Sequence, residues 1–169
     1  MPNPDVATSV DPSEFRRVLG HFCSGLTIVA ASHGGEPIGM TCQSFTSLSL
    51  DPPLVGFSPA KTSTTYPQIR ASGGFCINVL ADRQEDLALS FSSRTGDRWS
   101  DIDWSAGPSG NPRIAGVVAW IDCDLEAEHE VGDHYLVVGR VKALSAATTR
   151  PLLYFQSGFH RLATPAQGV

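Results

Sequence analysis

The sequence predicts a closed, mostly antiparallel β-barrel with two or three helices. From about residue 26 of the 169-residue chain, short apolar runs of period two recur, the spacing typical of half-buried strands. Glycine, proline and aspartate separate these runs, as turn residues do between strands. The chain has no internal repeat, and its length suits one domain with a single sizeable core. Many short strands with few helices are typical of small barrels.

The composition argues against several classes of protein. The 17 acidic side chains outnumber the 12 basic ones, and the formal net charge of −5 disfavours binding to nucleic acid or to an anionic membrane surface. No apolar run reaches the length of a membrane span, and no signal peptide is visible. Four widely spaced cysteines favour buried thiols in a reducing cytoplasm over a disulfide framework or a zinc site. Only 17% of the residues are charged, so small polar residues or a partner must cover much of the surface.

The first regular element is expected to be a helix that follows a loose segment, residues 1–10. Asp11 is the expected N-cap, and Glu14 three residues later completes a capping box. Gly25 is expected to end the helix. One apolar stripe at helical spacing comprises Phe15, Val18, Leu19 and Phe22.

Eight later runs of apolar or alternating residues predict strands. They cover residues 26–31, 38–43, 44–50, 54–57, 75–80, 117–130, 135–144 and 151–155. Gly34-Gly35 and Gly132-Asp133 are the expected hairpin turns.

Two more helices are expected between these strands. One runs up to Ala71 and is ended by Gly73-Gly74, and the other begins with a capping box of Asp82 and Glu85 and ends at Ser92. Residues 93–111 then form a polar loop whose length indicates a function beyond connection.

The strand expected from about residue 117 has acidic residues at alternate positions. These are Asp122, Asp124, Glu126, Glu128 and Glu130. Because period two places them on one side of a strand, we interpret them as a solvated face rather than as paired catalytic carboxylates.

Two polar segments could bind a ligand. Lys61-Thr62-Ser63-Thr64-Thr65 precedes a helix, where free N–H groups, hydroxyls and an ammonium could hold a phosphate; a cap cluster with a solvated lysine is the alternative. Residues 39–47 place several polar side chains on a barrel strand, where they could line a heteroaromatic ring or form a solvated edge.

Two loops could add charged contacts. His134 follows the Gly132-Asp133 turn, so rigid strands would aim its imidazole at a charged or redox ligand; an exposed turn histidine without a role is the alternative. Arg94 and Arg98 lie in the loop of residues 92–98 and could contact phosphate, unless this loop is only surface. The sequence has no G-x-S-x-G, G-x-G-x-x-G, H-E-x-x-H or P-loop motif, so a nucleotide cofactor would not be held by a Rossmann or Walker loop.

Six segments of the chain, taken together, match the pattern of a known family. They are Phe15-Arg16-x-Val18-Leu19-x-x-Phe22-x-x-Gly25-Leu26-Thr27-Ile28-Val29, Gly39-Met40-Thr41-Cys42-Gln43-Ser44-Phe45, Leu48-Ser49-Leu50-Asp51-Pro52-Pro53-Leu54-Val55, Phe75-Cys76-Ile77-Asn78-Val79-Leu80, Gly132-Asp133-His134 and Pro151-Leu152-Leu153-Tyr154-Phe155. These segments resemble the flavin reductase-like family of FMN-binding split barrels, in particular the short reductase components of two-component flavin monooxygenases. The resemblance covers residues 11–162 and leaves residues 163–169 as a tail.

The resemblance implies a homodimer of six-stranded antiparallel split barrels of Greek-key type, with a flavin near the subunit interface. The isoalloxazine ring and ribityl chain would be lined by Gly39, Met40, Thr41, Cys42, Gln43, Ser44 and Ser47. The phosphate would be held by Pro59, Ala60, Lys61, Ser63 and Thr64, with Arg94 near the nucleotide end. His134 matches the position beside the nicotinamide, and Tyr154 lies on the strand expected near it.

The activity implied by the resemblance is that of an NAD(P)H:flavin oxidoreductase. Such an enzyme reduces FMN or FAD with NADH or NADPH and supplies the reduced flavin to a separate oxygenase. We hypothesise that the nicotinamide stacks on the flavin and transfers a hydride, while backbone and hydroxyl donors stabilise the anionic reduced ring. Two alternatives stay open: a non-catalytic flavin-binding barrel for storage or sensing, and an interaction module whose polar strand is an edge.

Overall fold

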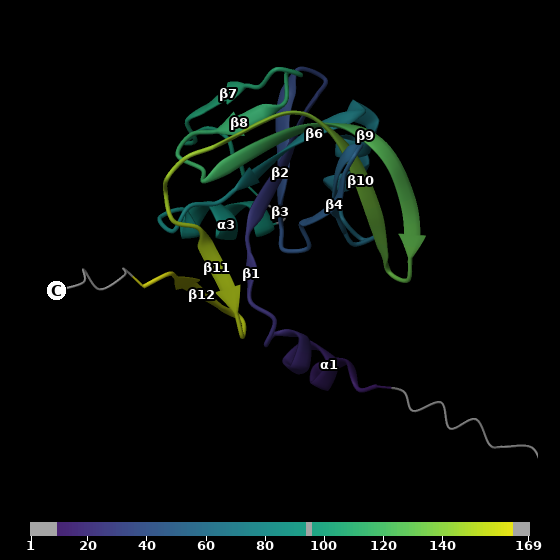
Figure 1. Ribbon diagram of the computed structural model, residues 1–169, viewed down its shortest axis with the longest axis vertical. Coiled ribbons are helices and arrows are strands. Elements are labelled where there is room, and N and C mark those ends of the chain that lie inside the picture. The colour runs from purple at the N-terminus through teal and green to yellow at the C-terminus, as the bar shows by residue number, and fades with distance from the viewer. Residues whose placement is uncertain (1–9, 94–95, 164–169) are drawn as a thin grey trace, which may run out of the picture.

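The structure, a computed structural model, describes residues 10–93 and 96–163. Its main sheet is antiparallel throughout and curls around the core (Figure 1). Within the described residues this sheet has seven strands, in the order β3-β2-β6-β9-β10-β5-β4. These strands are β2 (Thr27–His33), β3 (Glu36–Cys42), β4 (Thr46–Leu50), β5 (Pro53–Phe57), β6 (Gly74–Val79), β9 (Ala119–Val131) and β10 (His134–Ala146).

Smaller sheets and helices complete the described part of the chain. A three-stranded sheet comprises β1 (Ser24–Gly25), β11 (Leu152–Phe155) and β12 (Gly158–Arg161), and a two-stranded one comprises β7 (Trp104–Ala106) and β8 (Pro112–Ile114). The helices are α1 (Pro12–Leu19), α2 (Tyr66–Ser72) and α3 (Glu85–Ser92). Helix α2 packs mainly on β2, and α3 packs mainly on β3.

The mainly β, antiparallel character predicted from the sequence is confirmed. The implied number of six strands differs from the seven found in the described main sheet, because β4 pairs with β5 as an additional edge strand. The order begins at β3 and ends at β4, and no ladder among the described residues joins these two edges. Backbone hydrogen bonds therefore do not close the barrel as we expected.

Strand β2 lies between two apolar cores. Val29 and Ala31 face one core, and Ile28 and Ala30 face the other. The first core also contains Phe57, Tyr66, Ile69, Phe75 and Val137; the second also contains Leu80, Ala88, Phe91 and Leu152. Because both faces of β2 are buried, its sequence is apolar at consecutive positions rather than alternating.

The first helix begins as predicted but ends early. The Asp11 carboxylate accepts hydrogen bonds from the backbone N–H groups of Ser13 and Glu14, at 2.9 and 3.0 Å, which confirms the N-cap. The Glu14 side chain pairs with Arg17 instead of reaching back to the cap. The helix stops at Leu19, with Gly20 as C-cap, because the chain then enters β1 and pairs with β11. The prediction that Gly25 ends the helix is therefore wrong.

The capping box predicted for α3 is also wrong. The helix begins at Glu85, and its N-cap is Gln84 rather than Asp82. The Gln84 side chain binds the preceding turn, accepting a hydrogen bond from Ala81 N at 2.9 Å. For α2 the predicted end is correct, since Gly73 takes the left-handed conformation with φ of 71°.

The acidic strand face is not uniformly solvated. Asp122 is fully buried and accepts hydrogen bonds from Ser109 N at 2.8 Å and from Asn111 Nδ2 at 3.0 Å. The loop before β8 thus covers this carboxylate and satisfies both of its oxygens. Glu126 and Glu128 form ion pairs with Arg140 and Arg70. The prediction of a single solvated face is therefore wrong, because a register shift between Val138 and Gly139 interrupts the alternation and Glu128 pairs with the core residue Val137.

Several predictions concern the ends and the long loop. The loose segment at 1–10 and the tail at 163–169 lie outside the described residues except at Val10 and Ala163, and Arg94 also lies outside them. Part of the loop at 93–111 is a strand, since β7 pairs with β8. No described helix is long and apolar enough to cross a membrane.

Candidate functional site

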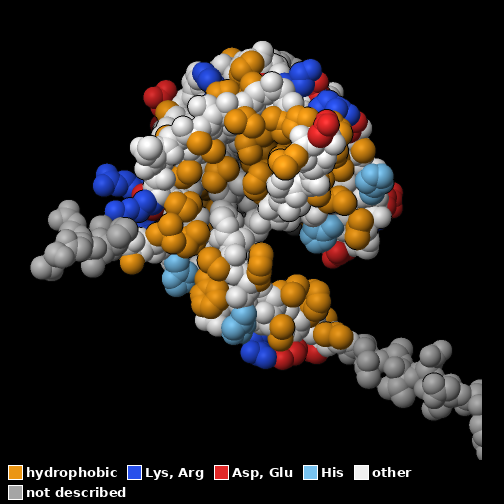
Figure 2. Space-filling view, viewed as in Figure 1, with side chains coloured by type: hydrophobic (Ala, Val, Ile, Leu, Met, Phe, Trp, Pro, Cys, Tyr) orange, Lys and Arg blue, Asp and Glu red, His pale blue; other side chains and the backbone are white. Residues whose placement is uncertain are grey.

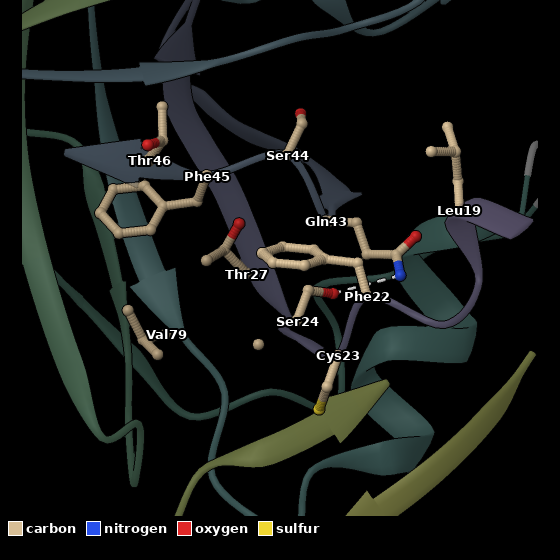
Figure 3. Close-up of a pocket in the computed structure, with 11 residues that line it drawn as sticks. Leu19, Phe22, Cys23, Ser24, Thr27, Gln43, Ser44, Phe45, Thr46 and Val79 are labelled. Carbon is tan, nitrogen blue, oxygen red and sulfur yellow. Dashed lines mark hydrogen bonds between the residues drawn. The ribbon is translucent and has the colours of Figure 1, made fainter. Parts of the chain in front are cut away.

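Two cavities meet at Gln43. The larger has a volume of about 630 Å³ and lies between the α1 end of the chain and the main sheet (Figure 3). It is lined by Leu19, Phe22, Cys23, Ser24, Gly25, Thr27, Gln43, Ser44, Phe45, Thr46 and Val79. The smaller has a volume of about 370 Å³ and is lined by Leu26, Thr41, Gln43, Ala88, Leu89, Ser92, Tyr154, Ser157 and Phe159. Both volumes suit small-molecule sites.

Strand β3 divides the predicted flavin-binding residues between two faces. Consecutive side chains of a strand point to opposite sides. Met40 and Cys42 therefore share one side with the core beneath α2, and Ser44 continues this side in the loop. Gly39 and Thr41 face α3 instead, as their contacts show.

On the first side, the β3 end contacts the loop that contains the predicted phosphate residues. Ser44 Oγ accepts a hydrogen bond from Ser58 N at 2.7 Å and lies 3.1 Å from Cys42 Sγ. Ser63 Oγ lies 3.8 Å from Met40 Sδ. The structure thus brings the predicted ring-lining and phosphate-binding segments together.

On the second side, polar groups line the smaller cavity. Thr41 Oγ1 donates to Ala88 O of α3 at 2.7 Å, and Gln43 Nε2 donates to Ser24 Oγ at 3.2 Å (Figure 3). Tyr154 pairs with Ser24 through the β1–β11 ladder and lines the same cavity. Tyr154 therefore lines the same cavity as Thr41 and Gln43.

Gly39 is required by packing. A Cβ at this position would lie 2.9 Å from Phe91 Cε1 and 3.1 Å from Trp99 Cζ2. Its carbonyl accepts a hydrogen bond from Arg98 Nη1 at 3.2 Å. The described part of the 92–98 loop thus anchors to β3 through Arg98.

The hairpin tip between β9 and β10 contacts the predicted phosphate loop through its backbone. Lys61 N donates to Asp133 O at 2.9 Å, Tyr135 N donates to Pro59 O at 3.0 Å, and Ala60 bridges to His134. His134 Nδ1 lies 2.7 Å from the Asp133 carboxylate, which accepts a hydrogen bond from the ring, and this hydrogen bond lowers the pKa of Asp133. Contacts between segments more than 70 positions apart in the sequence thus hold His134 beside the loop that contains Lys61.

The start of α2 does not offer the free N–H groups that we predicted. Tyr66 N donates to Ser63 Oγ at 3.1 Å, and the N–H groups of Gln68 and Ile69 donate to Thr65 O. Pro67 has no N–H group. Anion binding by the helix start is therefore not supported, and Ser63 serves as a cap.

The remaining predicted residues are exposed. Lys61 Nζ forms an ion pair with Glu130 at 2.8 Å, which raises the pKa of the lysine. Because Glu130 is 72% exposed, this pair is weak enough to exchange for a phosphate. Thr64 is exposed, and Ser47 is exposed opposite Val55 of β5.

Comparison with known proteins identifies related chains. The family described as "Flavin reductase like domain" matches residues 19–163. A relative from Rhodococcus jostii, named as the flavin-dependent monooxygenase reductase subunit HsaB, is 47% identical over 90% of this chain and 79% of its own length.

Two solved structures share both fold and sequence with this chain. Nitrilotriacetate monooxygenase component B from Mycobacterium thermoresistibile has a TM-score of 0.87 and 44% identity, over 93% of this chain and 92% of its own. A Streptomyces globisporus NADH:FAD oxidoreductase in complex with NAD and FAD fragments has a TM-score of 0.87 and 37% identity, over 94% of this chain and 98% of its own.

Proposed function

This chain belongs to the flavin reductase-like domain family, and from that premise we propose that it reduces FMN or FAD with NADH or NADPH and supplies the reduced flavin to a separate monooxygenase. The relatives named as reductase subunits of flavin-dependent monooxygenases support this activity, and the relative in complex with NAD and FAD fragments supports these cofactors.

The observation that carries the proposal is the meeting of three distant segments. Hydrogen bonds join the end of β3 at Ser44 to the loop at 58–61, and that loop to the hairpin tip at His134; Ser44 also lines the cavity of about 630 Å³. Convergent polar groups at the mouth of a concave, largely apolar site are typical of cofactor binding. The residues present therefore suit a flavin.

We assign the flavin to the larger cavity and its surroundings. Gln43, Ser44 and the backbone through Thr46 would line the ring, with Met40 and Cys42 behind them, Ser47 toward the ribityl chain, and Gly39 and Thr41 supporting the strand. The phosphate would lie at Pro59, Ala60, Lys61, Ser63 and Thr64, where the ammonium of Lys61 would leave Glu130. When bound, the flavin supplies the hydride-accepting ring.

His134 is the proposed contact to the nicotinamide. Its Nδ1 donates a hydrogen bond to Asp133, a contact that favours one orientation of the imidazole. Its side chain is 44% exposed and hence accessible. Tyr154 would lie in the smaller cavity, on the side of Gln43 that faces away from the flavin.

We propose a homodimer in which a second copy covers α1 and the hollow beside it. Helix α1 buries none of its residues, although Phe15, Val18 and Leu19 form its apolar stripe, and Phe22 beyond it is 80% exposed. Figure 2 shows hydrophobic side chains along this lobe and the hollow between it and the body. A second barrel packed there would enclose the larger cavity, which is where a flavin at an interface would lie.

We also propose a cytoplasmic location and a six-stranded split barrel for this chain. All four cysteines are free thiols in the structure, which suits a reducing cytoplasm. We regard β4 as an edge addition to a six-stranded split barrel.

The activity can be tested with the purified protein. NADH and NADPH oxidation is followed in air, with and without added FMN or FAD, and the visible spectrum is recorded first. We expect oxidation that depends on flavin. A yellow protein that oxidises neither nucleotide would support a non-catalytic flavin binder, and the absence of both colour and turnover would contradict flavin binding altogether.

A further inference from the structure

Arg70 of α2 lies beside two tyrosine rings that contact each other, and it pairs with one carboxylate. Its Nε and Nη2 donate to Glu128 of β9 at 2.8 and 2.7 Å. Its guanidinium carbon lies 5.1 Å from the ring centroid of Tyr66 and 4.8 Å from that of Tyr135. Tyr66 Oη also donates a short hydrogen bond to Glu128. These four residues, Tyr66, Arg70, Glu128 and Tyr135, are called the Arg70 clamp.

The clamp is partly buried, and its Arg70 side chain is 41% exposed. Tyr66 is 1% exposed and packs edge-on against Phe57 of the core, and the Glu128 side chain is 24% exposed. A bidentate arginine–carboxylate pair in such a place is directional and rigid. It joins helix α2 to strand β9 through two hydrogen bonds, whereas the similarly exposed Arg140–Glu126 pair joins two adjacent strands.

The clamp lies directly beneath the hairpin tip. Val137 pairs with Glu128, Tyr135 pairs with Glu130, and His134 pairs with Val131 in the β9–β10 ladder. Tyr135 is therefore a clamp residue and the immediate neighbour of His134. Its ring also lies 5.7 Å from Lys61 Nζ, so the same ring contacts the loop expected to hold the phosphate.

We propose that Arg70 is a positioning residue, which sets the tip that bears His134 against the loop that bears Lys61. The inference rests on the proposed function, because it explains how the nicotinamide and phosphate contacts are kept in register. The role is separate from anchoring α2, since Tyr66 and Ile69 bury that helix without the guanidinium. Loss of the two guanidinium hydrogen bonds to Glu128 should increase the mobility of the hairpin tip, while the core stays packed.

The chain offers a matched control. Arg140 of β10 forms a bidentate pair with Glu126 of the same strand β9, at 2.8 and 2.5 Å, and this pair does not involve α2. Arg70→Lys and Arg140→Lys each keep the charge and remove the planar fork. Only the first should affect the site.

The kinetic test measures KM for NADH and kcat at saturating FMN. We expect Arg70→Lys to raise KM about tenfold with kcat within about twofold, since small misplacements of a binding group are costly. Arg140→Lys should leave both within about twofold. In a His134→Ala background the Arg70→Lys effect on KM should shrink to less than about twofold, because coupled residues are not additive.

A second readout does not depend on turnover. Amide hydrogen exchange at Lys61 N and Tyr135 N, which bond the loop to the tip, should be faster in Arg70→Lys and unchanged in Arg140→Lys. If Arg70→Lys does not fold, Tyr66→Phe removes only the hydroxyl bond to Glu128, and a smaller change in the same direction is expected.

The outcomes separate this inference from the proposed function. Equal exchange at both amides in wild type and Arg70→Lys overturns the clamp, whatever the activity. A KM that rises equally with and without His134 also overturns it. If exchange accelerates but no variant and no wild-type protein oxidises NADH, the clamp stands as a structural device and the proposed function fails.

Discussion

The α1 arm (residues 12–25) and the rim (residues 58–65 and 128–135) differ in whether their side chains find partners within one chain. At the rim, Lys61 pairs with Glu130 and His134 pairs with Asp133. On the arm, Leu19 and Phe22 are exposed, and the arm is tied to the body by the β1–β11 ladder and by Gln156 N donating to Gly20 O. The rim is thus complete within one chain, whereas the arm has an apolar face that a second copy would cover.

The largest difference between the two regions should appear in the stability of the single chain. Phe57 lies beneath the rim and is fully buried, so Phe57→Ala should lower the free energy of unfolding by about 3–5 kcal/mol. Phe22→Ala on the arm should change it by less than about 0.5 kcal/mol at concentrations where the chain is monomeric. Urea denaturation of both variants measures this. Equal losses would mean that the arm packs on its own chain.

Dimer formation, in contrast, should depend on the arm. Leu19→Asp places a charge on the apolar face of α1, and we expect the dimer dissociation constant to rise by about 10- to 100-fold, or about 1.4–2.8 kcal/mol. Leu144→Asp, at an exposed position of β10, is the matched control. Sedimentation over a concentration series distinguishes them. A wild-type chain that stays monomeric at every concentration would contradict the role given to the arm.

Alkaline pH should lower the free energy of unfolding through Tyr66, which is hydrogen-bonded to Glu128 of the rim. Burial, followed by the hydrogen bond to Glu128, raises the pKa of Tyr66. The unfolded chain then loses this proton near pH 10 while the folded chain keeps it, so the contribution is fully present below about pH 10 and is lost as pH rises. The loss should reach about 1.4 kcal/mol for each pH unit above that value. Denaturation at pH 8–11, with Tyr66→Phe as the non-titrating control, measures the difference. Parallel curves for the two proteins would rule out Tyr66 as the cause.

Thiol reactivity gives the smallest effect and compares the arm with the core. Cys23 on the arm is exposed, whereas burial raises the pKa of Cys76 and of Cys123 to about 12. A disulfide reagent at pH 8 should therefore modify Cys23 rapidly, and the other described thiols only on unfolding. Cys23→Ser should abolish the fast phase. A fast phase that survives this substitution would place a second reactive thiol at the surface.

Local features of the fold could be predicted from the sequence because they depend on nearby residues. Asp11 caps α1, Gly73 ends α2, and Gly34-Gly35 turns the β2–β3 hairpin, each with its backbone in the expected conformation. Features that depend on distant segments could not. The burial of Asp122 needs the loop at Ser109, which alternation along β9 does not report.

The same distinction holds for the candidate site. The polar residues of β3 and of the 59–64 loop were expected from their composition and from the family resemblance, and the structure brings Ser44 and Met40 close to that loop. The alternation of side chains along β3 predicts that its residues face two sides. That Thr41 hydrogen-bonds to helix α3 could not be predicted, because it depends on where α3 packs. Arg70 and Glu128 are 58 residues apart, and no local signal connects them.

The central claim is that the rim, with His134 at its tip, is where NADH meets the flavin site. The most direct test is the KM for NADH of His134→Ala, compared with wild type and with His33→Ala, an exposed histidine at the end of the β2–β3 hairpin. We expect flavin-dependent oxidation in all three, with KM raised about tenfold in His134→Ala, equivalent to about 1.4 kcal/mol. In His33→Ala it should stay within about twofold of wild type. A His134→Ala enzyme with unchanged kinetics would contradict the claim.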